Sequence, residues 1–306
     1  MRAPARGADG VGLLFGVGAY GSWGVFPAFF PLLKPAGATE VLAHRIVWTV
    51  LFMAVVLFAV RRWGDLRAIT GRVWLLLACA SGLISVNWLI YIYAVNSGHV
   101  VDAALGYFIN PLVSVVLGVV IFGERLNRAQ GVAIAIAVAA VLLLAVGVGG
   151  TPWIALGLAC SFGLYGAVKK VVPTDPRVSV SVEAGLAAPF AVAYLVALQH
   201  SGHANFTNHG TGHLLLMLLC GPVTAIPLLC FAAAAQRLAL VTLGLLQYLT
   251  PSMQMGWGLL VGHEPMTAAR WVGFALIWAA LAVFTGDALR RARGRDEVAS
   301  RAFGEP

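Results

Sequence analysis

The chain is divided into ten apolar stretches, each long enough to cross a lipid bilayer as a helix. A hydrocarbon core about 30 Å thick requires roughly 20 helical residues per crossing. Of the 306 residues, 60% are hydrophobic and only 10% are charged, which leaves too little polar surface for a water-soluble globule. The sequence therefore predicts an all-α integral membrane protein. The expected spans are Gly10 to Leu33, Ala38 to Val60, Val73 to Val95, Val100 to Phe122, Gln130 to Val148, Pro152 to Val171, Val178 to Gln199, Gly212 to Ala235, Ala239 to Val261 and Thr267 to Ala288.

Lys and Arg residues are distributed unevenly between the two sides of the membrane. Seventeen of the 20 precede the first span, follow an even-numbered span or lie in the tail, and the exceptions are Lys34, Arg45 and Arg270. The positive-inside rule places the basic side in the cytoplasm. We therefore expect a multi-pass protein of a bacterial-type inner membrane, with both termini cytoplasmic. Lys169 and Lys170, at the end of the sixth span, are interpreted as such topology determinants.

Two further features of composition bear on partners. The net charge of +8 is divided among several short loops and forms no continuous basic patch of the kind expected of a nucleic-acid binder, so we expect anionic lipid head groups as its partner and no nucleic acid. The longer outer loop is rich in histidine. Because no Cys or carboxylate accompanies these histidines, a polar loop is favoured over a metal site, and neither a metal nor a cofactor is expected. The histidines are His200, His203, His209 and His213.

The two halves of the chain resemble one another at an offset of 140 residues. Pro111 aligns with Pro251, and Glu124 aligns with Glu264. Each half holds five expected spans, and an odd number makes the second copy enter the membrane from the opposite side. The sequence thus predicts two inverted five-helix repeats, residues 1–149 and 150–306, within one transmembrane domain.

Inverted repeats are a recurrent basis of secondary transporters, in which the substrate lies between the halves. The chain has no P-loop, no H-E-x-x-H and no G-x-S-x-G motif. We therefore expect a permease for small organic molecules and not an enzyme. We expect it to work without ATP and to act as an exporter. The alternatives are a membrane-embedded or lipid-modifying enzyme, which should cluster carboxylates, His or Cys at one membrane face, and a channel, which should have a continuous polar lining.

Polar groups in the second expected span are candidates for a transport pathway. Glu40, His44 and Trp48 recur every four residues and so share one helix face, with Arg45 adjacent. Glu40 and Arg45 lie near the outer membrane edge, where an anchoring role is also plausible. His44 can bind a proton near neutral pH. If a proton is the coupling ion, we expect His44 to bind it with Glu40 and Arg45 as neighbours; the alternative is a hydrogen bond that orients the span.

Prolines occur in the middle of the fourth and ninth spans. Pro111 removes the helical hydrogen bond of the Tyr107 carbonyl, and Pro251 removes that of the Gln247 carbonyl. Freed carbonyls at membrane depth are tolerated where they face protein or water. We therefore expect two kinks facing a central cavity, although such prolines can also only shape packing. The pathway residues at the kinks are Tyr107, Asn110, Gln247 and Tyr248.

Aromatic residues with a polar handle occur in the first and third spans. Asn87 and Tyr91 share a face of the third span, and Trp23 lies in the first. Such side chains suit a partly apolar organic substrate. Single aromatic residues in membrane helices also serve packing or the interfacial belt. We include Trp23, Asn87 and Tyr91 in the expected substrate pathway.

With these motifs, the sequence resembles the EamA branch of the drug/metabolite transporter superfamily, and within it the RarD-type permeases. The resemblance extends over nearly the full length. It implies a ten-helix, inner-membrane carrier with its cavity between two inverted halves, and the family label implies drug export. The residues it carries over are His44, Arg45, Trp48, Asn87, Tyr107, Asn110, Pro111, Gln247 and Tyr248. The matching stretches are Glu40 to Trp48 (EVLAHRIVW), Asn87-Trp88, Gly106 to Pro111 (GYFINP), Gly123 to Arg125 (GER), and Phe231 through Arg237 to Gln247-Tyr248.

Overall fold

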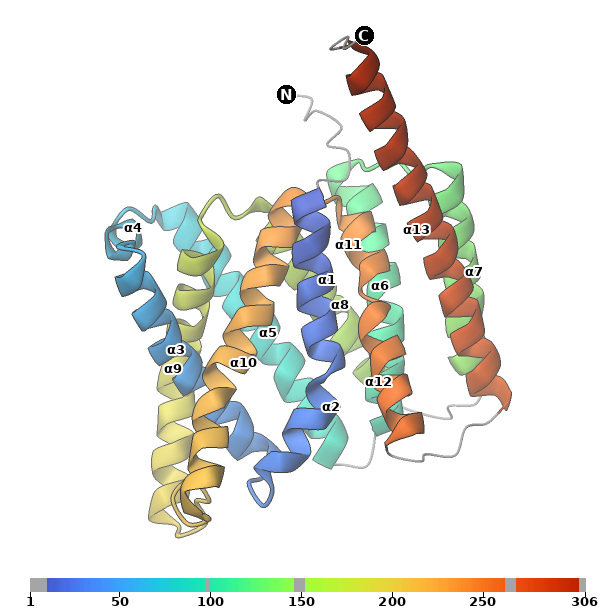
Figure 1. The fold of residues 1–306 in the computed structure, drawn as a ribbon. Helices are drawn as coiled ribbons and strands as arrows, with labels where there is room; N and C mark the ends of the chain where they lie inside the picture. The colour runs from blue at the N-terminus through green and yellow to red at the C-terminus, as the bar shows by residue number, and fades with distance from the viewer. Residues whose placement is uncertain (1–9, 97–99, 146–151, 262–267, 303–306) are drawn as a thin grey trace.

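The protein is a bundle of long helices in a computed structural model that describes residues 10–96, 100–145, 152–261 and 268–302 (Figure 1). Within these ranges every regular element is helical. The elements are α1 (Gly10–Gly24), α2 (Phe26–Phe29), the 3₁₀ helix η1 (Phe30–Leu33), α3 (Ala38–Ala59), α4 (Trp63–Arg67), α5 (Gly71–Asn96), α6 (Val100–Phe122), α7 (Arg128–Ala145), α8 (Pro152–Val171), α9 (Pro176–His200), α10 (Gly210–Arg237), α11 (Leu240–Leu246), α12 (Leu249–Leu260) and α13 (Ala268–Ala302).

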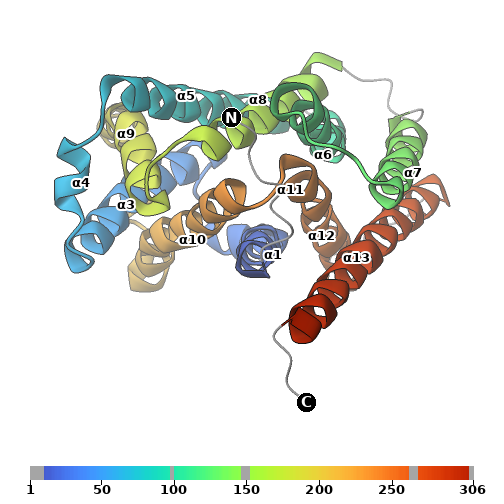
Figure 2. The same ribbon diagram turned by 90° about the horizontal axis from the view of Figure 1, so that it is seen from above.

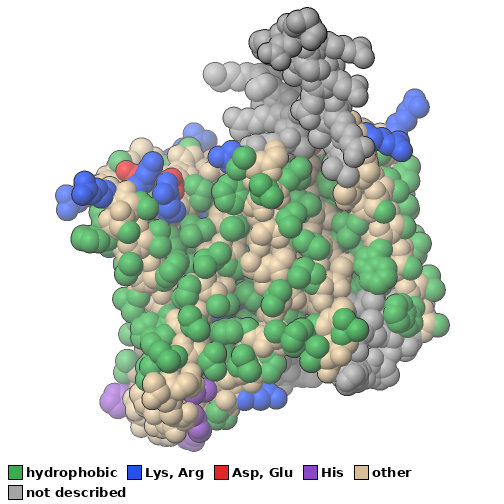
Figure 3. Space-filling model, viewed as in Figure 1, with side chains coloured by type: hydrophobic (Ala, Val, Ile, Leu, Met, Phe, Trp, Pro, Cys, Tyr) green, Lys and Arg blue, Asp and Glu red, His purple; other side chains and the backbone are tan. Residues whose placement is uncertain are grey.

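Among the described residues, eight helical segments are long and apolar enough to cross a membrane, and a shorter apolar helix covers Trp271–Asp287 within α13. The expected all-α membrane fold is confirmed. Helices are favoured because the bilayer offers no partner for backbone N–H and C=O groups, which a helix satisfies within itself. Their outward surfaces are apolar: Leu14, Phe58 and Phe190 are 73%, 75% and 80% exposed. Figure 3 shows hydrophobic side chains over the middle of the molecule.

The two ends of the bundle differ in charge. One end, the terminal face, carries the start of α1, the end of α13 and α4; the other, the loop face, carries α2, η1 and the connection 201–209 (Figure 1). Lys and Arg gather mainly at the terminal face, and His gathers at the loop face (Figure 3). This asymmetry is the one that the sequence predicts. The orientation of the termini in the membrane remains a prediction.

The main contacts between helices are symmetric: when each span is replaced by its equivalent in the other half, the main pairs of helices are again in contact. α3 packs on α9, α6 on α11 and α7 on α13, and each pair joins spans that correspond across the halves (Figure 2). The contact of α1 with α10 corresponds to that of α5 with α8, and α3 with α10 corresponds to α5 with α9. The Tyr248 hydroxyl donates to the carbonyl of Phe108, 140 residues earlier, at 3.3 Å. The division into two inverted repeats remains a prediction.

The two proline-containing spans have different backbones. α6 continues through Pro111, whereas the ninth span is divided at Gln247 and Tyr248 into α11 and α12. The Gln247 carbonyl, which loses its helical donor at Pro251, accepts the N–H of Thr250 at 3.2 Å, a tighter 3₁₀-type bond. The two kinks expected from the sequence are therefore not symmetric, because the fourth span is a continuous helix and the ninth span is broken.

The proline segments pack directly on each other. A Cβ at Gly244 of α11 would lie 2.8 Å from the Pro111 carbonyl oxygen and 2.9 Å from Cβ of Ser114. Glycine at this position therefore permits α11 to approach α6. In this conformation the two segments are side by side, and the cavity between α3, α5, α8, α9 and α10 does not include them.

Candidate functional site

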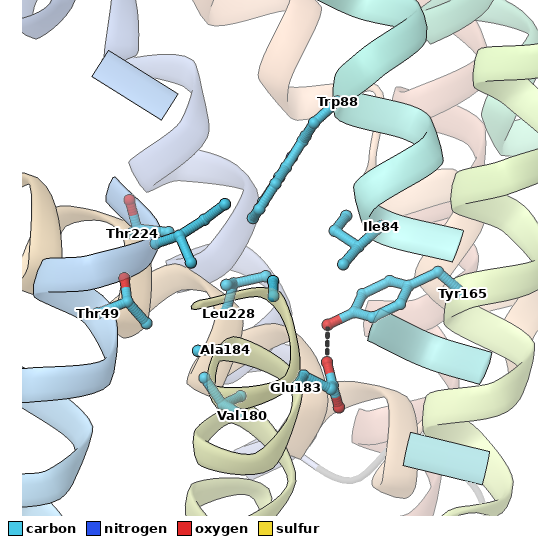
Figure 4. A pocket seen from close by; sticks show the side chains of 11 residues that line it. Thr49, Ile84, Trp88, Tyr165, Val180, Glu183, Ala184, Thr224 and Leu228 are labelled. Atoms are coloured by element: carbon cyan, nitrogen blue, oxygen red, sulfur yellow. Dashed lines mark hydrogen bonds between the residues drawn. The ribbon is translucent and has the colours of Figure 1, made fainter. Parts of the chain in front are cut away.

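A narrow cavity of about 30 Å³ lies between five helices (Figure 4). Its walls come from α3 and α5 of the first expected half and from α8, α9 and α10 of the second. A space of this size has room for roughly one or two water molecules. The lining combines apolar side chains with a few polar groups, as is typical of small-molecule sites. Its polar and aromatic lining residues are Thr49, Trp88, Tyr165, Glu183 and Thr224.

Arg45 lies against two of these lining residues. Its Nε donates to the hydroxyl of Thr224 at 3.0 Å, and its guanidinium carbon is 5.3 Å from the centre of the Trp88 ring. The rings of Phe26 and Phe30 lie 5.7 Å and 5.4 Å away. Aromatic faces attract cations at these distances. The structure thus directs Arg45 into the bundle, away from the anchoring position that its place in the sequence suggested.

Two predicted tyrosines lie near Arg45. Tyr91 and Tyr107 both interact electrostatically with its guanidinium, and their rings are 6.0 Å apart. Tyr91 is 40% exposed, whereas Tyr107 is partly buried. The structure therefore brings Arg45, Tyr91 and Tyr107 together from α3, α5 and α6.

A buried ion pair closes another part of the cavity wall. Lys169 Nζ lies 2.6 Å from Glu183 Oε1, and the two side chains are 0% and 6% exposed. Ser179 donates to the same oxygen at 2.7 Å, and the Tyr165 hydroxyl donates to the other carboxylate oxygen at 3.0 Å (Figure 4). The carboxylate charge is therefore balanced and hydrogen-bonded. Lys169 is an interior residue, unlike the surface topology determinant expected from the sequence.

Glu183 was missed by the sequence interpretation. The signal was available, because Glu183 is the only acidic residue between Val178 and Gln199, and an ionisable group inside a membrane span is a functional candidate. Its partner Lys169 is adjacent to Lys170, and the sequence alone does not separate the two. Only the contacts of Lys169 with Ser179 and Glu183 of α9 distinguish these two lysines.

The predicted residues at the proline segments have unsatisfied polar groups. Both amide atoms of Asn110 and Oε1 of Gln247 are buried without a hydrogen-bond partner in the described part of the chain. Such groups are uncommon in proteins, since an unpaired buried polar atom costs free energy. Tyr248 is fully buried and bonded to Phe108, as described above. Asn110 and Gln247 thus remain candidates for contact with water or substrate.

Trp23 and Asn87 occupy packed positions. The Trp23 ring lies 5.7 Å from both Phe162 and Phe231, inside an aromatic cluster. The Asn87 amide donates to the Leu158 carbonyl and to the Ser161 hydroxyl, both at 2.9 Å. These bonds hold α5 against α8. The structure therefore places Trp23 and Asn87 in helix contacts and does not bring them to the cavity.

Glu40 and His44 belong to a group at the loop face. The Glu40 carboxylate accepts two hydrogen bonds from Asn205, one from the backbone N–H at 2.6 Å and one from the side-chain amide at 2.8 Å. The Trp48 indole donates to Nδ1 of His44 at 3.1 Å, and Phe206 stacks on the His44 ring at 4.6 Å. This bond requires a lone pair on Nδ1, so the arrangement suits the neutral ring. His44 and Glu40 therefore tie α3 to the loop-face connection.

The histidines of this connection form no metal site in the described part of the chain, where no group of three His, Cys, Asp or Glu side chains could hold an ion. His213 is buried and bonds the Leu33 carbonyl at 3.1 Å. The rings of His209 and His213 meet edge to face with 5.5 Å between their centres. These contacts link α10 to η1.

Glu124 joins α6 to the start of α11 at the terminal face. Its carboxylate accepts the backbone N–H groups of Leu240 and Val241 at 2.7 Å and 2.9 Å. Lys170 lies 3.2 Å from the same carboxylate and donates to the Leu238 carbonyl at 2.6 Å. The carboxylate thus satisfies helix-end amides that have no intrahelical partner. Its repeat equivalent, Glu264, lies outside the described residues, as does His263 before it.

Comparisons with known proteins agree with the resemblance found from the motifs. The model of the EamA-like transporter family matches residues 10–146. Protein RarD of Streptomyces exfoliatus is 50% identical over 94% of this chain and 92% of its own length. An uncharacterized transporter, YojE, of Bacillus subtilis is 43% identical over 90% of this chain and 93% of its own length.

The helix arrangement is also found in a solved crystal structure. That structure matches with a TM-score of 0.71 over 92% of this chain and 99% of its own, at 22% sequence identity. Identity at this level supports the fold alone. The resemblance to the EamA family and its RarD-type permeases is therefore confirmed by the family model and the sequence relatives, and not by this structure.

Proposed function

The chain belongs to the EamA family of membrane transporters, in its RarD group, and from this premise we propose that it carries small organic molecules across the inner membrane by alternating access. The substrate binds in the cavity between α3, α5, α8, α9 and α10 and is released after the helices around it rearrange. Transport without a nucleotide site draws on an ion or substrate gradient.

The observation that carries this proposal is the composition of the cavity wall. Two helices of the first expected half and three of the second contribute to it. A site shared by two halves changes shape when one half rocks against the other, which is how carriers expose a site to alternate sides. The small volume in this conformation corresponds to a closed site, because organic substrates need pockets of roughly 300 Å³ or more.

Two further points support a transport pathway through the bundle. Asn110 and Gln247 present buried polar atoms that lack a partner in the described residues. The guanidinium of Arg45 lies against the ring of Trp88, which lines the cavity. Polar groups at membrane depth are costly and usually serve a function. We propose export as the direction of transport, following the family label. The relatives named above give no support to the alternative of a membrane enzyme.

Thiol accessibility tests the cavity directly. Thr49→Cys and Thr224→Cys, each in a chain whose four native cysteines are replaced, should react with a small hydrophilic thiol reagent and should be protected by a transported compound. Ala137→Cys is the matched control, because Ala137 is as buried as the two threonines but packs between α7 and α13 and does not line the cavity, so it should stay inert. Inertness of both threonine positions would contradict the proposed site.

Transport itself is measured by counterflow in proteoliposomes. Vesicles loaded with a mixture of organic acids, amines, amino acids and neutral drugs should exchange at least one of these compounds with its labelled form, as followed by mass spectrometry. Thr224→Val should reduce the exchange because it removes a polar wall group. Export is tested with inside-out membrane vesicles, which should accumulate the same compound. Absence of exchange for the whole mixture would contradict carrier function.

A further inference from the structure

Two cationic side chains lie inside the described bundle, and their surroundings differ. Lys169 is neutralised by Glu183, with 2.6 Å between Nζ and Oε1, and it also donates to the Ser179 hydroxyl. Arg45 has no carboxylate within ion-pair distance in the described part of the chain. A cation without an opposite charge is costly in an apolar region. Its presence beside a cavity therefore calls for a negative partner.

The groups near Arg45 do not supply that partner. Glu40, five residues earlier on α3, has its carboxylate bound by the backbone and side-chain amides of Asn205. His44 is held by Trp48 in a form that suits the neutral ring. The direct contacts of Arg45 are the Thr224 hydroxyl and three aromatic rings. No acidic side chain of the described residues therefore neutralises the charge of this guanidinium.

The geometry leaves one side of the guanidinium available for binding. Only Nε has a hydrogen-bond acceptor, the Thr224 hydroxyl at 3.0 Å, so neither terminal nitrogen has a partner among the described residues. These two nitrogens form the planar fork that binds carboxylates in a bidentate manner. Both Thr224 and Trp88, which hold Arg45, also line the cavity. A molecule in the cavity therefore lies next to the two residues that position the fork.

We propose that Arg45 binds the anionic group of the substrate, and that the substrate is an organic carboxylate with an apolar body. This inference rests on the proposed transport function and names its substrate class. The carboxylate pairs with the Arg45 fork. The apolar body packs against Trp88, Phe26 and Phe30, whose rings already surround the guanidinium. The hydroxyls of Tyr91 and Tyr107 stand near the same charge and can donate to a carboxylate oxygen.

The test uses three compounds with one apolar body and different charges: 3-phenylpropionate, its amide, and 3-phenylpropylamine. The purified full-length protein in detergent should be stabilised against heat by the carboxylate, with little effect of the amide or the amine. Arg45→Gln should weaken carboxylate binding by at least about tenfold, in line with a charge-assisted hydrogen bond. Arg45→Lys keeps the charge without the fork and should bind with intermediate affinity.

Matched controls separate this site from general charge effects. Arg67→Gln removes an exposed cation from α4 and should leave carboxylate binding unchanged. Sulfate and a phospholipid headgroup, glycerol phosphate, test whether an inorganic or lipid anion is preferred. Stabilisation by these anions without the carboxylate would overturn the proposal.

The comparison of the three compounds uses the wild-type protein, so it does not depend on whether the Arg45 variants fold. Equal stabilisation by the carboxylate, amide and amine would overturn the inference, as would no stabilisation by the carboxylate. Counterflow of neutral or cationic compounds, with no dependence on Arg45, would overturn the substrate class and leave carrier function standing. Absence of all exchange would instead contradict the proposed function.

Discussion

Lys169 and Glu183 form an ion pair inside the membrane-spanning bundle, with 2.6 Å between Nζ and Oε1 and almost no exposure of either side chain. The pair joins α8 to α9 beside the cavity. Because both charges are buried, removing only one of them leaves the other uncompensated.

Lys169→Met should therefore lower the free energy of unfolding by about 3–5 kcal/mol, since the Glu183 charge loses its partner. The double variant Lys169→Met with Glu183→Gln should recover most of this loss, because no charge remains buried. Thermal unfolding of the detergent-solubilised protein measures both. Arg67→Gln is the control and should change stability by less than about 0.5 kcal/mol. If the double variant is as unstable as Lys169→Met alone, the loss of stability does not come from an uncompensated Glu183 charge.

Glu124→Ala should destabilise the contact between α6 and α11, because the amides of Leu240 and Val241 lose their acceptor and Lys170 loses its counter-charge. Loss of a helix-end cap costs about 1 kcal/mol, and Glu124→Gln should cost less because its amide oxygen still accepts. Hydrogen exchange at residues 240–241 measures the effect. Unchanged protection in Glu124→Ala would show that the cap is dispensable.

Reporter fusions should place both termini in the cytoplasm. The physical reason is the gathering of Lys and Arg at the terminal face of the bundle (Figure 3). A fusion of alkaline phosphatase after residue 306 should be inactive, whereas a fusion between Gln199 and Gly212 should be active. Periplasmic activity from the tail fusion would contradict the ten-span topology.

If transport is proton-coupled, His44→Gln should exchange substrate across the membrane but should fail to accumulate it under an imposed pH difference. A proton on Nδ1 would remove the lone pair that accepts the Trp48 indole, so proton uptake would disturb the contacts of α3 with Phe206. Trp48→Phe keeps the stacking, removes the donor and should retain accumulation. Uphill transport by His44→Gln would exclude the role.

The start of α9 should show a small pH-dependent stabilisation. Hydrogen bonds from Arg177 hold the pKa of Asp175 below its usual value, and Asp175 also accepts the N–H of Arg177 as a helix cap. A depressed pKa means that this stabilisation is present above the unfolded pKa, about 3.9. It is lost as the pH falls through the lower folded pKa. Asp175→Asn should thus be less stable than wild type at pH 7 by up to about 1 kcal/mol, with the difference shrinking in acid. A difference that does not depend on pH would contradict this origin.

Much of the fold could be predicted because the information is local in the chain. Apolar stretches about 20 residues long identify helices that must satisfy their own backbone groups in lipid. The different backbones of α6 and α11–α12 could not be predicted from Pro111 and Pro251 alone. Pro111 lies inside the continuous helix α6, whereas Pro251 lies in the first turn of α12, just after the break at Gln247 and Tyr248. A proline is tolerated in the first turn of a helix, because its missing N–H would have no intrahelical partner there.

The candidate site depended more on packing. The sequence by itself determined that Arg45, Tyr91 and Tyr107 would lie at membrane depth or its edge, since each belongs to an apolar stretch. Only the tertiary structure decided that Lys169 is neutralised by Glu183 while Arg45 has no carboxylate partner in the described residues. The physical reason is that ion pairing acts over a few ångströms and depends on which helices touch, whereas hydrophobicity acts along each segment and is visible before the helices meet.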